Sequence, residues 1–226
     1  MNLQPLCSPM IKYGIILTLL FGFGIQTQAQ DPLRFQEEVD QLTLKYGDAP
    51  RGEDLILFTG SSSVKGWRDL SAYFPDHQMI NAGFGGSQTS DLLHYVDELI
   101  IQYQPKKVFI YEGDNDISAG KSTEEILEDT HELVEKIKSK LPETKILLIS
   151  AKPSISRWHL RDKYLDLNQH FEEYSQSHEN VDYVDVWTTM LDEEGKPKAD
   201  IFLEDNLHMN KAGYDLWAEV IGKYMD

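Results

Sequence analysis

The residues best suited to chemistry are a serine in the first third of the chain and an Asp-x-x-His pair near its end. Ser62 is the middle member of a serine triplet at 61–63, and Asp205 precedes His208 by three residues. A serine hydroxyl becomes a nucleophile when an imidazole accepts its proton, and a carboxylate orients that imidazole and stabilises its charged form. Ser62, His208 and Asp205 are therefore candidates for a nucleophile, a base and the partner of the base.

The first 29 residues predict a secretory signal peptide. Lys12 precedes an uncharged, mostly apolar run at 13–25, and a polar stretch then ends at Ala29. We expect cleavage after Ala29, which leaves residues 30–226 as one domain in a periplasmic or secreted protein. A retained anchor is the alternative. Because the run is shorter than the roughly 20 residues of a membrane span, we expect no stable membrane insertion after cleavage.

The composition narrows the range of partners. The chain has 38 Asp and Glu residues against 21 Lys and Arg residues, which gives a net charge of −17. Such a charge repels nucleic acid and anionic membrane surfaces, so we expect neither as a partner. The single cysteine, Cys7, lies within the expected signal peptide, which leaves no cysteine for a disulfide or a metal site.

The elements that must position these residues alternate between strands and helices. Short apolar strands are expected at 55–59, 79–82, 108–112, 145–150 and 181–186. Helix-start signals lie before, between and after them: Pro32, a capping box formed by Ser122 and Glu125, and a cap at Asn210. One helix is expected to run from about residue 92 to Pro105, and another from about Trp158. The pattern predicts a five-stranded parallel sheet in a three-layer α/β/α sandwich.

Polar and glycine-rich segments follow the first, second, third and fifth of these strands. They lie at 60–67, 81–87, 113–116 and 205–208. One such segment is usually only a turn or a helix cap. In parallel sheets, however, ligands bind at the carboxyl ends of the strands, so four segments at one edge predict an active site.

The four segments resemble the sequence blocks of the SGNH, or GDSL-like, hydrolases. That family has Gly-Asp-Ser after a strand, then Asn-x-Gly-x-x-Gly, Gly-x-Asn-Asp, and Asp-x-x-His before the final helix. The resemblance implies a flavodoxin-like fold and acyl-ester hydrolysis, with Ser62 as nucleophile, His208 as base and Asp205 as its partner. It also implies an oxyanion hole made by the N–H groups of Ser62 and Gly86 and by the side-chain amide of Asn115.

The chain departs from the family pattern at one position. Ser61 stands where the family usually has aspartate. Since that aspartate is not the acid of the triad, its loss bears on the geometry of the loops rather than on the mechanism. The triplet also leaves Ser61 and Ser63 as alternative nucleophiles, but the spacing to Gly60 and Gly66 favours Ser62.

Other motifs compete with this interpretation. Asp91 and His94 share the Asp-x-x-His spacing, but early in a helix we expect a solvated pair there. A dinucleotide fingerprint at 83–88 lacks its third glycine, and a P-loop ending at Ser122 lacks its first. The chain has no Gly-x-Ser-x-Gly elbow.

No cofactor and no metal are expected from these patterns. The alternative is a metal site collected from Asp114, Asp116, Asp205 and His208, but no tight ligand spacing supports it.

The sequence therefore predicts an exported serine esterase that removes a short acyl group, with a small acyl ester or an acylated glycan, for example an acetylated carbohydrate, as substrate. Trp67, Phe84 and Trp158 could offer stacking surfaces for a sugar. Two alternatives remain: a non-catalytic carbohydrate-binding protein on a hydrolase scaffold, and an acyltransferase that uses the same triad.

Overall fold

A parallel β-sheet forms the centre of the domain. The computed structural model describes Met1 and residues 31–49, 51–52 and 54–225, and the expected signal peptide otherwise lies outside these residues. The sheet has five strands in the order β2-β1-β3-β4-β5, and every neighbouring pair is parallel. The strands are β1 (Leu55–Gly60), β2 (Gln78–Gly83), β3 (Lys107–Tyr111), β4 (Lys145–Ile149) and β5 (Val181–Val184).

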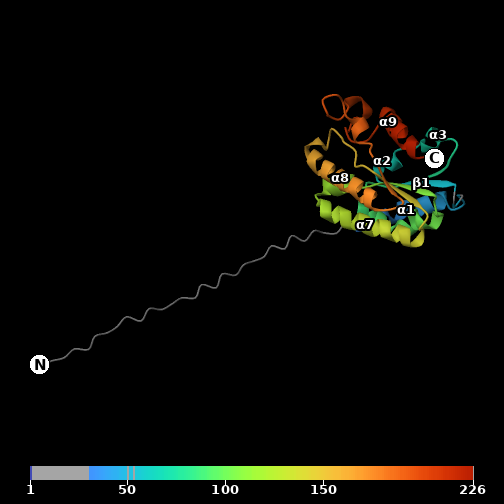
Figure 1. Ribbon diagram of the computed structural model, residues 1–226, viewed down its shortest axis with the longest axis horizontal. Helices are drawn as coiled ribbons and strands as arrows, with labels where there is room; N and C mark the ends of the chain where they lie inside the picture. The colour runs from blue at the N-terminus through green and yellow to red at the C-terminus, as the bar shows by residue number, and fades with distance from the viewer. Residues whose placement is uncertain (2–30, 50, 53, 226) are drawn as a thin grey trace. The chain divides into compact units, whose positions relative to one another are not determined.

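Helices cover both faces of the sheet, as predicted. In Figure 1, α2, α3 and α9 lie on one side of β1, and α1 and α7 lie on the other. The α-helices are α1 (Gln36–Lys45), α2 (Ser62–Lys65), α3 (Leu70–Tyr73), α4 (Thr89–His94), α5 (Val96–Leu99), α6 (Asp114–Ala119), α7 (Thr123–Lys140), α8 (Arg161–Ser177) and α9 (Lys211–Ile221). The 3-10 helices are η1 (Pro32–Phe35), η2 (Ile101–Tyr103), η3 (Trp158–Leu160), η4 (Thr188–Met190), η5 (Ala199–Ile201) and η6 (Gly222–Tyr224).

The helix-start signals act as expected at two positions. The Ser122 hydroxyl accepts the N–H of Glu125, and the Glu125 carboxylate accepts the N–H of Ser122, which completes the capping box of α7. Asn210 accepts the N–H groups of residues 212 and 213 and begins α9. The helix expected to run as far as Pro105 is instead divided into α4, α5 and η2, because the backbone leaves helical geometry at Tyr95 and Ile100.

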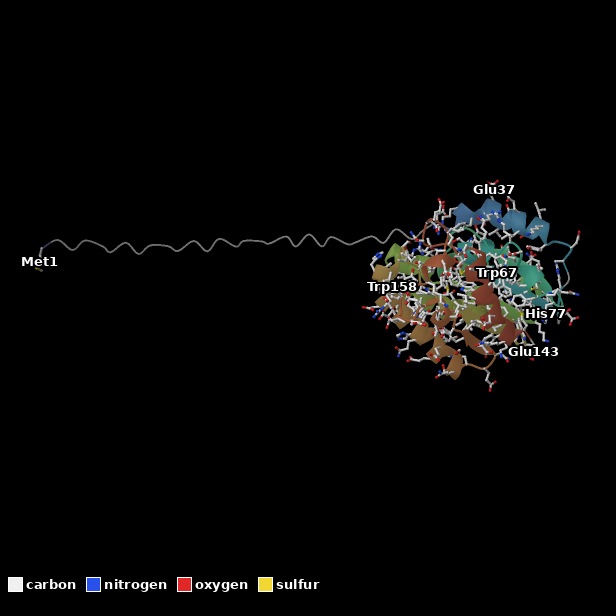
Figure 2. The ribbon with its side chains drawn as sticks, turned by 90° about the horizontal axis from the view of Figure 1, so that it is seen from above. Met1, Glu37, Trp67, His77, Glu143 and Trp158 are labelled. Atoms are coloured by element: carbon white, nitrogen blue, oxygen red, sulfur yellow. The ribbon has the colours of Figure 1, made fainter. Side chains whose placement is uncertain are left out.

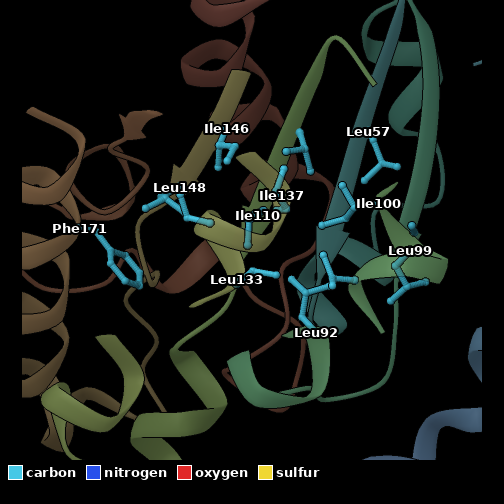
Figure 3. Close-up of a cluster of buried hydrophobic side chains, with 14 of the residues drawn as sticks. Leu57, Leu92, Leu99, Ile100, Ile110, Leu133, Ile137, Ile146, Leu148 and Phe171 are labelled. Carbon is cyan, nitrogen blue, oxygen red and sulfur yellow. The ribbon is translucent and has the colours of Figure 1, made fainter. Parts of the chain in front are cut away.

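Two apolar clusters, one on each face of the sheet, fill the space between the strands and the helices. Alternate strand residues face opposite sides: Leu57 and Ile110 join one cluster, and Phe58 and Phe109 join the other. Figure 3 shows the first cluster, in which strand side chains such as Ile110 meet side chains of α4, α5, α7 and α8. Burial on both faces explains why the three central strands, β1, β3 and β4, are mostly apolar.

The two ends of the strands face opposite sides of the domain. Figure 2 shows Trp158, which follows β4, on the opposite side of the domain from His77 and Glu143, which precede β2 and β4. The segments singled out by the sequence begin at the carboxyl ends of the strands, on the side of Trp158.

No helix in the described part of the chain combines the length and the apolar run that a membrane span requires.

Candidate active site

The nucleophile candidate lies in a sharp turn between β1 and α2. Gly60 ends β1 with φ of +117°, and a Cβ at this position would lie 2.1 Å from the backbone oxygen of Tyr111. Only glycine tolerates both that backbone conformation and that close approach. Ser61 is then extended, and Ser62 is the first residue of α2. The turn therefore presents Ser62 at the carboxyl end of β1.

The structure brings Ser62, His208 and Asp205 into one chain of hydrogen bonds. His208 Nε2 lies 3.0 Å from Ser62 Oγ, and His208 Nδ1 lies 2.6 Å from Asp205 Oδ2. The contact between Ser62 and His208 joins residues 146 positions apart. With the proton on Nδ1, this geometry leaves Nε2 free to accept the proton of the serine hydroxyl.

A tight loop holds Asp205 and His208. The other oxygen of Asp205, Oδ1, accepts the backbone N–H groups of Leu207 and His208, each at 2.9 Å. Asn206 adopts the left-handed conformation with φ of +56°, which asparagine tolerates well. A backbone hydrogen bond of 2.8 Å from the N–H of Leu203 to the oxygen of His208 closes the loop.

The electrostatics of this loop keep Asp205 ionised. The hydrogen bond from His208, together with those from two backbone N–H groups, lowers the pKa of Asp205 to about 2. The Asp205 side chain is 48% exposed, so hydrogen bonding rather than burial controls the shift. Asp205 therefore carries a full negative charge at neutral pH and can stabilise a charged imidazole.

The two remaining oxyanion candidates lie beside each other. Asn115 is in the first turn of α6, after β3, and Gly86 is in the loop after β2. A Cβ at position 86 would lie 3.7 Å from Asn115 Nδ2, and this nitrogen also donates to the oxygen of Ser87 at 2.9 Å. In the sheet Gly60 pairs with Gly83 on one side and Tyr111 on the other. The segments that carry Ser62, Gly86 and Asn115 therefore start from adjacent positions.

The N-terminal helix braces two of these segments, a role that the sequence reasoning missed. Glu38 of α1 accepts the N–H of Gly85 at 2.9 Å and pairs with Lys65, the last residue of α2, at 2.7 Å. The ring of Phe35 fills the space where a Cβ of Gly85 would lie. Helical spacing alone gives no signal for such contacts, because Glu38 reads as an ordinary surface residue.

A second feature that the sequence reasoning missed is a buried charge cluster behind Asn115. Asp114 Oδ1 lies 2.6 Å from Arg157 Nη1, and Asp114 Oδ2 lies 3.4 Å from Lys152 Nζ. Burial opposes the charge of Asp114, but Lys152 and Arg157 outweigh it and lower the pKa of Asp114 to about 2. The hydroxyl groups of Tyr111 and Tyr164 also donate to this carboxylate.

Buried carboxyl groups lie beneath the loop of Gly86. Ser87 Oγ donates to Glu112 at 2.6 Å, and Thr89 donates its N–H to Asp116, which pairs with Lys121 at 3.0 Å. Burial raises the pKa of Glu112 well above its usual range, and the negative charge of Asp116 adds to the shift. This environment therefore favours the protonated, uncharged form of Glu112.

Some expectations are corrected. Asp91 is not part of a solvated pair: it is 1% exposed, and Arg34 of η1 donates to it at 2.6 Å, because the N-terminal segment covers this part of α4. Trp67 and Phe84 are fully buried in the two apolar clusters, so neither offers a surface to a sugar. Trp158 is partly exposed and stacks on Trp187 with ring centroids 5.9 Å apart.

Several solved structures share the fold of this chain. A GDSL-like lipase from Bacteroides thetaiotaomicron has a TM-score of 0.69 at 22% identity, covering 86% of this chain and 97% of its own. A lipase/acylhydrolase from Enterococcus faecalis has 0.65 at 21%, covering 76% and 94%. A catalytic mutant of an acetylxylan esterase from Geobacillus stearothermophilus has 0.62 at 17%, covering 77% and 95%. At these identities the likeness establishes the SGNH hydrolase fold.

The family follows from the sequence model. The model of the GDSL-like Lipase/Acylhydrolase family matches residues 40–216, a range that includes Ser62, Gly86, Asn115, Asp205 and His208. The chain belongs to this family of acylhydrolases. No curated protein matches the chain.

Proposed function

We propose that this protein is an exported serine esterase that removes a short acyl group through a covalent acyl-enzyme. The observation that carries the proposal is the chain of hydrogen bonds from Ser62 through His208 to Asp205. Such a chain is what activates a serine hydroxyl, and a protein that only binds carbohydrate has no use for it.

The reaction proceeds in two steps. His208 takes the proton of Ser62 as Oγ attacks the acyl carbon, and the N–H groups of Ser62 and Gly86 and the amide of Asn115 stabilise the oxyanion. His208 then protonates the leaving alcohol, which departs and leaves the acyl group on Ser62. A water molecule, deprotonated by His208, attacks this ester and releases the acid.

A first experiment compares the mature protein with three alanine variants. The hydrolysis of p-nitrophenyl acetate and p-nitrophenyl butyrate is measured for the parent, Ser61→Ala, Ser62→Ala and Ser63→Ala. We expect turnover to disappear only in Ser62→Ala, while circular dichroism stays unchanged. A folded parent with no turnover on any ester would instead favour the carbohydrate-binding alternative, which glycan arrays test directly.

An acetylated glycan is the substrate class that we favour. The similar fold of an acetylxylan esterase supports this choice. Trp158 supports it as well, because its indole is partly exposed and the preceding residue, Arg157, contacts Asn115. Trp158→Ala should raise the KM for an acetylated oligosaccharide and leave the KM for p-nitrophenyl acetate unchanged. Equal effects on both substrates would argue against a sugar contact at Trp158.

Two parts of the proposal rest on other tests. If added sugars divert the acyl group from water to a sugar hydroxyl, the enzyme is an acyltransferase rather than a hydrolase. Export is tested by expressing the full chain and sequencing the protein from outside the cytoplasm, which should begin at Gln30.

A further inference from the structure

Asp114, Arg157 and Lys152 form an ion cluster at the carboxyl ends of β3 and β4, which we call the charge cluster. Their side chains are 5%, 17% and 1% exposed. Burying charges is expensive, and such a cluster persists only when each charge is well paired. Asp114 satisfies this condition, because both of its carboxylate oxygens contact a cation and a tyrosine hydroxyl.

Arg157 fixes the orientation of the oxyanion candidate. Its Nη1 donates to Asn115 Oδ1 at 3.1 Å, while Asn115 Nδ2 donates to the oxygen of Ser87 at 2.9 Å. Turning the amide by 180° would put its NH2 group against the guanidinium and its oxygen against a carbonyl. Both ends of the amide are therefore specified, and one N–H of Nδ2 remains to donate elsewhere.

Lys152 connects the same cluster to the loop of the base. Its Nζ donates to the backbone oxygen of Leu207 at 2.9 Å, and Leu207 is the residue immediately before His208. Since Lys152 and Arg157 share Asp114, one carboxylate anchors both the segment that carries the oxyanion donor and the loop that carries the base.

We propose that the charge cluster is a positioning device for acyl transfer, in which Arg157 aims the amide of Asn115 at the oxyanion and Lys152 fixes the backbone next to His208. This inference rests on the proposed esterase function. Arg157 also adds a positive charge directly behind the amide oxygen, which strengthens Asn115 as a donor when negative charge develops on the substrate. Neither cation touches the substrate in this scheme.

The test replaces Arg157 and measures kcat and KM separately with p-nitrophenyl acetate. We expect Arg157→Ala to lower kcat about 100-fold, comparable to the loss of one oxyanion donor, with KM nearly unchanged. Guanidinium ion, added far below the concentrations that unfold proteins, should restore part of kcat in Arg157→Ala and none in Asn115→Ala. Arg161→Ala is the matched control, because Arg161 lies four residues further on and pairs with the exposed Asp162.

A second variant keeps the test decisive if Arg157→Ala fails to fold. Arg157→Lys retains a positive charge beside Asp114 but lacks the guanidinium Nη1 that contacts both Asp114 Oδ1 and Asn115 Oδ1. We therefore expect kcat to fall at least about tenfold while the melting temperature stays close to that of the parent. Parent-like kcat in Arg157→Lys would overturn the proposal. So would a loss in Arg157→Ala that guanidinium does not relieve.

The two proposals fail in distinguishable ways. A parent protein without turnover on any ester contradicts the esterase function itself. An active parent whose Arg157 variants keep the parental kcat contradicts only the positioning role.

Discussion

The Asp205–His208 loop makes a sharp prediction for Asp205→Asn. Asp205 Oδ1 accepts two backbone N–H groups, so the amide oxygen of an asparagine must occupy that position. The NH2 group then faces His208 Nδ1, which can only accept from it, and the imidazole proton moves to Nε2. That nitrogen faces Ser62 Oγ at 3.0 Å and can no longer take its proton. We expect kcat to fall about 10⁴-fold, equivalent to about 5 kcal/mol of barrier.

The assay is kcat with p-nitrophenyl acetate at pH 7, together with circular dichroism and the melting temperature. Asp192→Asn is the matched control, because Asp192 Oδ1 also accepts two backbone N–H groups, those of Glu194 and Lys196, each at 2.9 Å. The control should keep parental activity. If Asp205→Asn retained kcat within about tenfold, the assignment of the tautomer through this loop would be refuted.

Three further results are expected. Gly60→Ala should unfold the domain, because its Cβ meets the Tyr111 backbone at 2.1 Å, whereas Gly120→Ala, with φ of +93° and open space, should cost only about 1–2 kcal/mol of unfolding free energy by denaturant titration. Glu112→Gln should raise the melting temperature relative to the parent more at pH 8 than at pH 5. The reason is that the pKa of Glu112 is raised in the folded state, so the parent loses stability as the pH rises above the ordinary glutamate pKa of 4.5. An equal gain in melting temperature at both pH values would contradict this. Ser61→Ala should preserve both stability and kcat, because the buried Ser61 hydroxyl has no hydrogen-bond partner among the described residues, and a tenfold loss of kcat would show that this hydroxyl has a role in the reaction.

Most of the fold could be predicted because the local signals and the burial pattern agree. The five strands lie within two residues of their expected bounds at each end, since mostly apolar runs such as that of β1, in which all six residues are buried, are typical of strands covered on both faces. The order β2-β1-β3-β4-β5 depends on contacts between distant strands, and no local pattern reports it. The division of the chain between α4, α5 and η2 was missed because the apolar spacing continues through the breaks.

The candidate site was predictable only where a side chain belongs to a motif. Ser62, Asp205 and His208 have types and spacings that suggest chemistry from the sequence alone. Lys152 and Arg157 do not, because isolated cations in a strongly charged sequence normally lie in solvent. Their burial is decided by the long-range pairing with Asp114, which only the folded chain reveals.

The strand order also explains why the candidate site forms where it does. After β1 the chain goes to one side of that strand to form β2, and β3 then returns to the other side, so β1 and β3 flank the point where the direction of the sheet reverses. Loops that leave neighbouring strands in opposite directions open a crevice at such a point. Ser62 follows β1 and Asn115 follows β3, so the proposed nucleophile and the proposed oxyanion donor follow the two strands that flank this point. The proposed base, His208, lies on a separate loop after β5, and under the positioning proposal Lys152 anchors this loop through the backbone oxygen of Leu207.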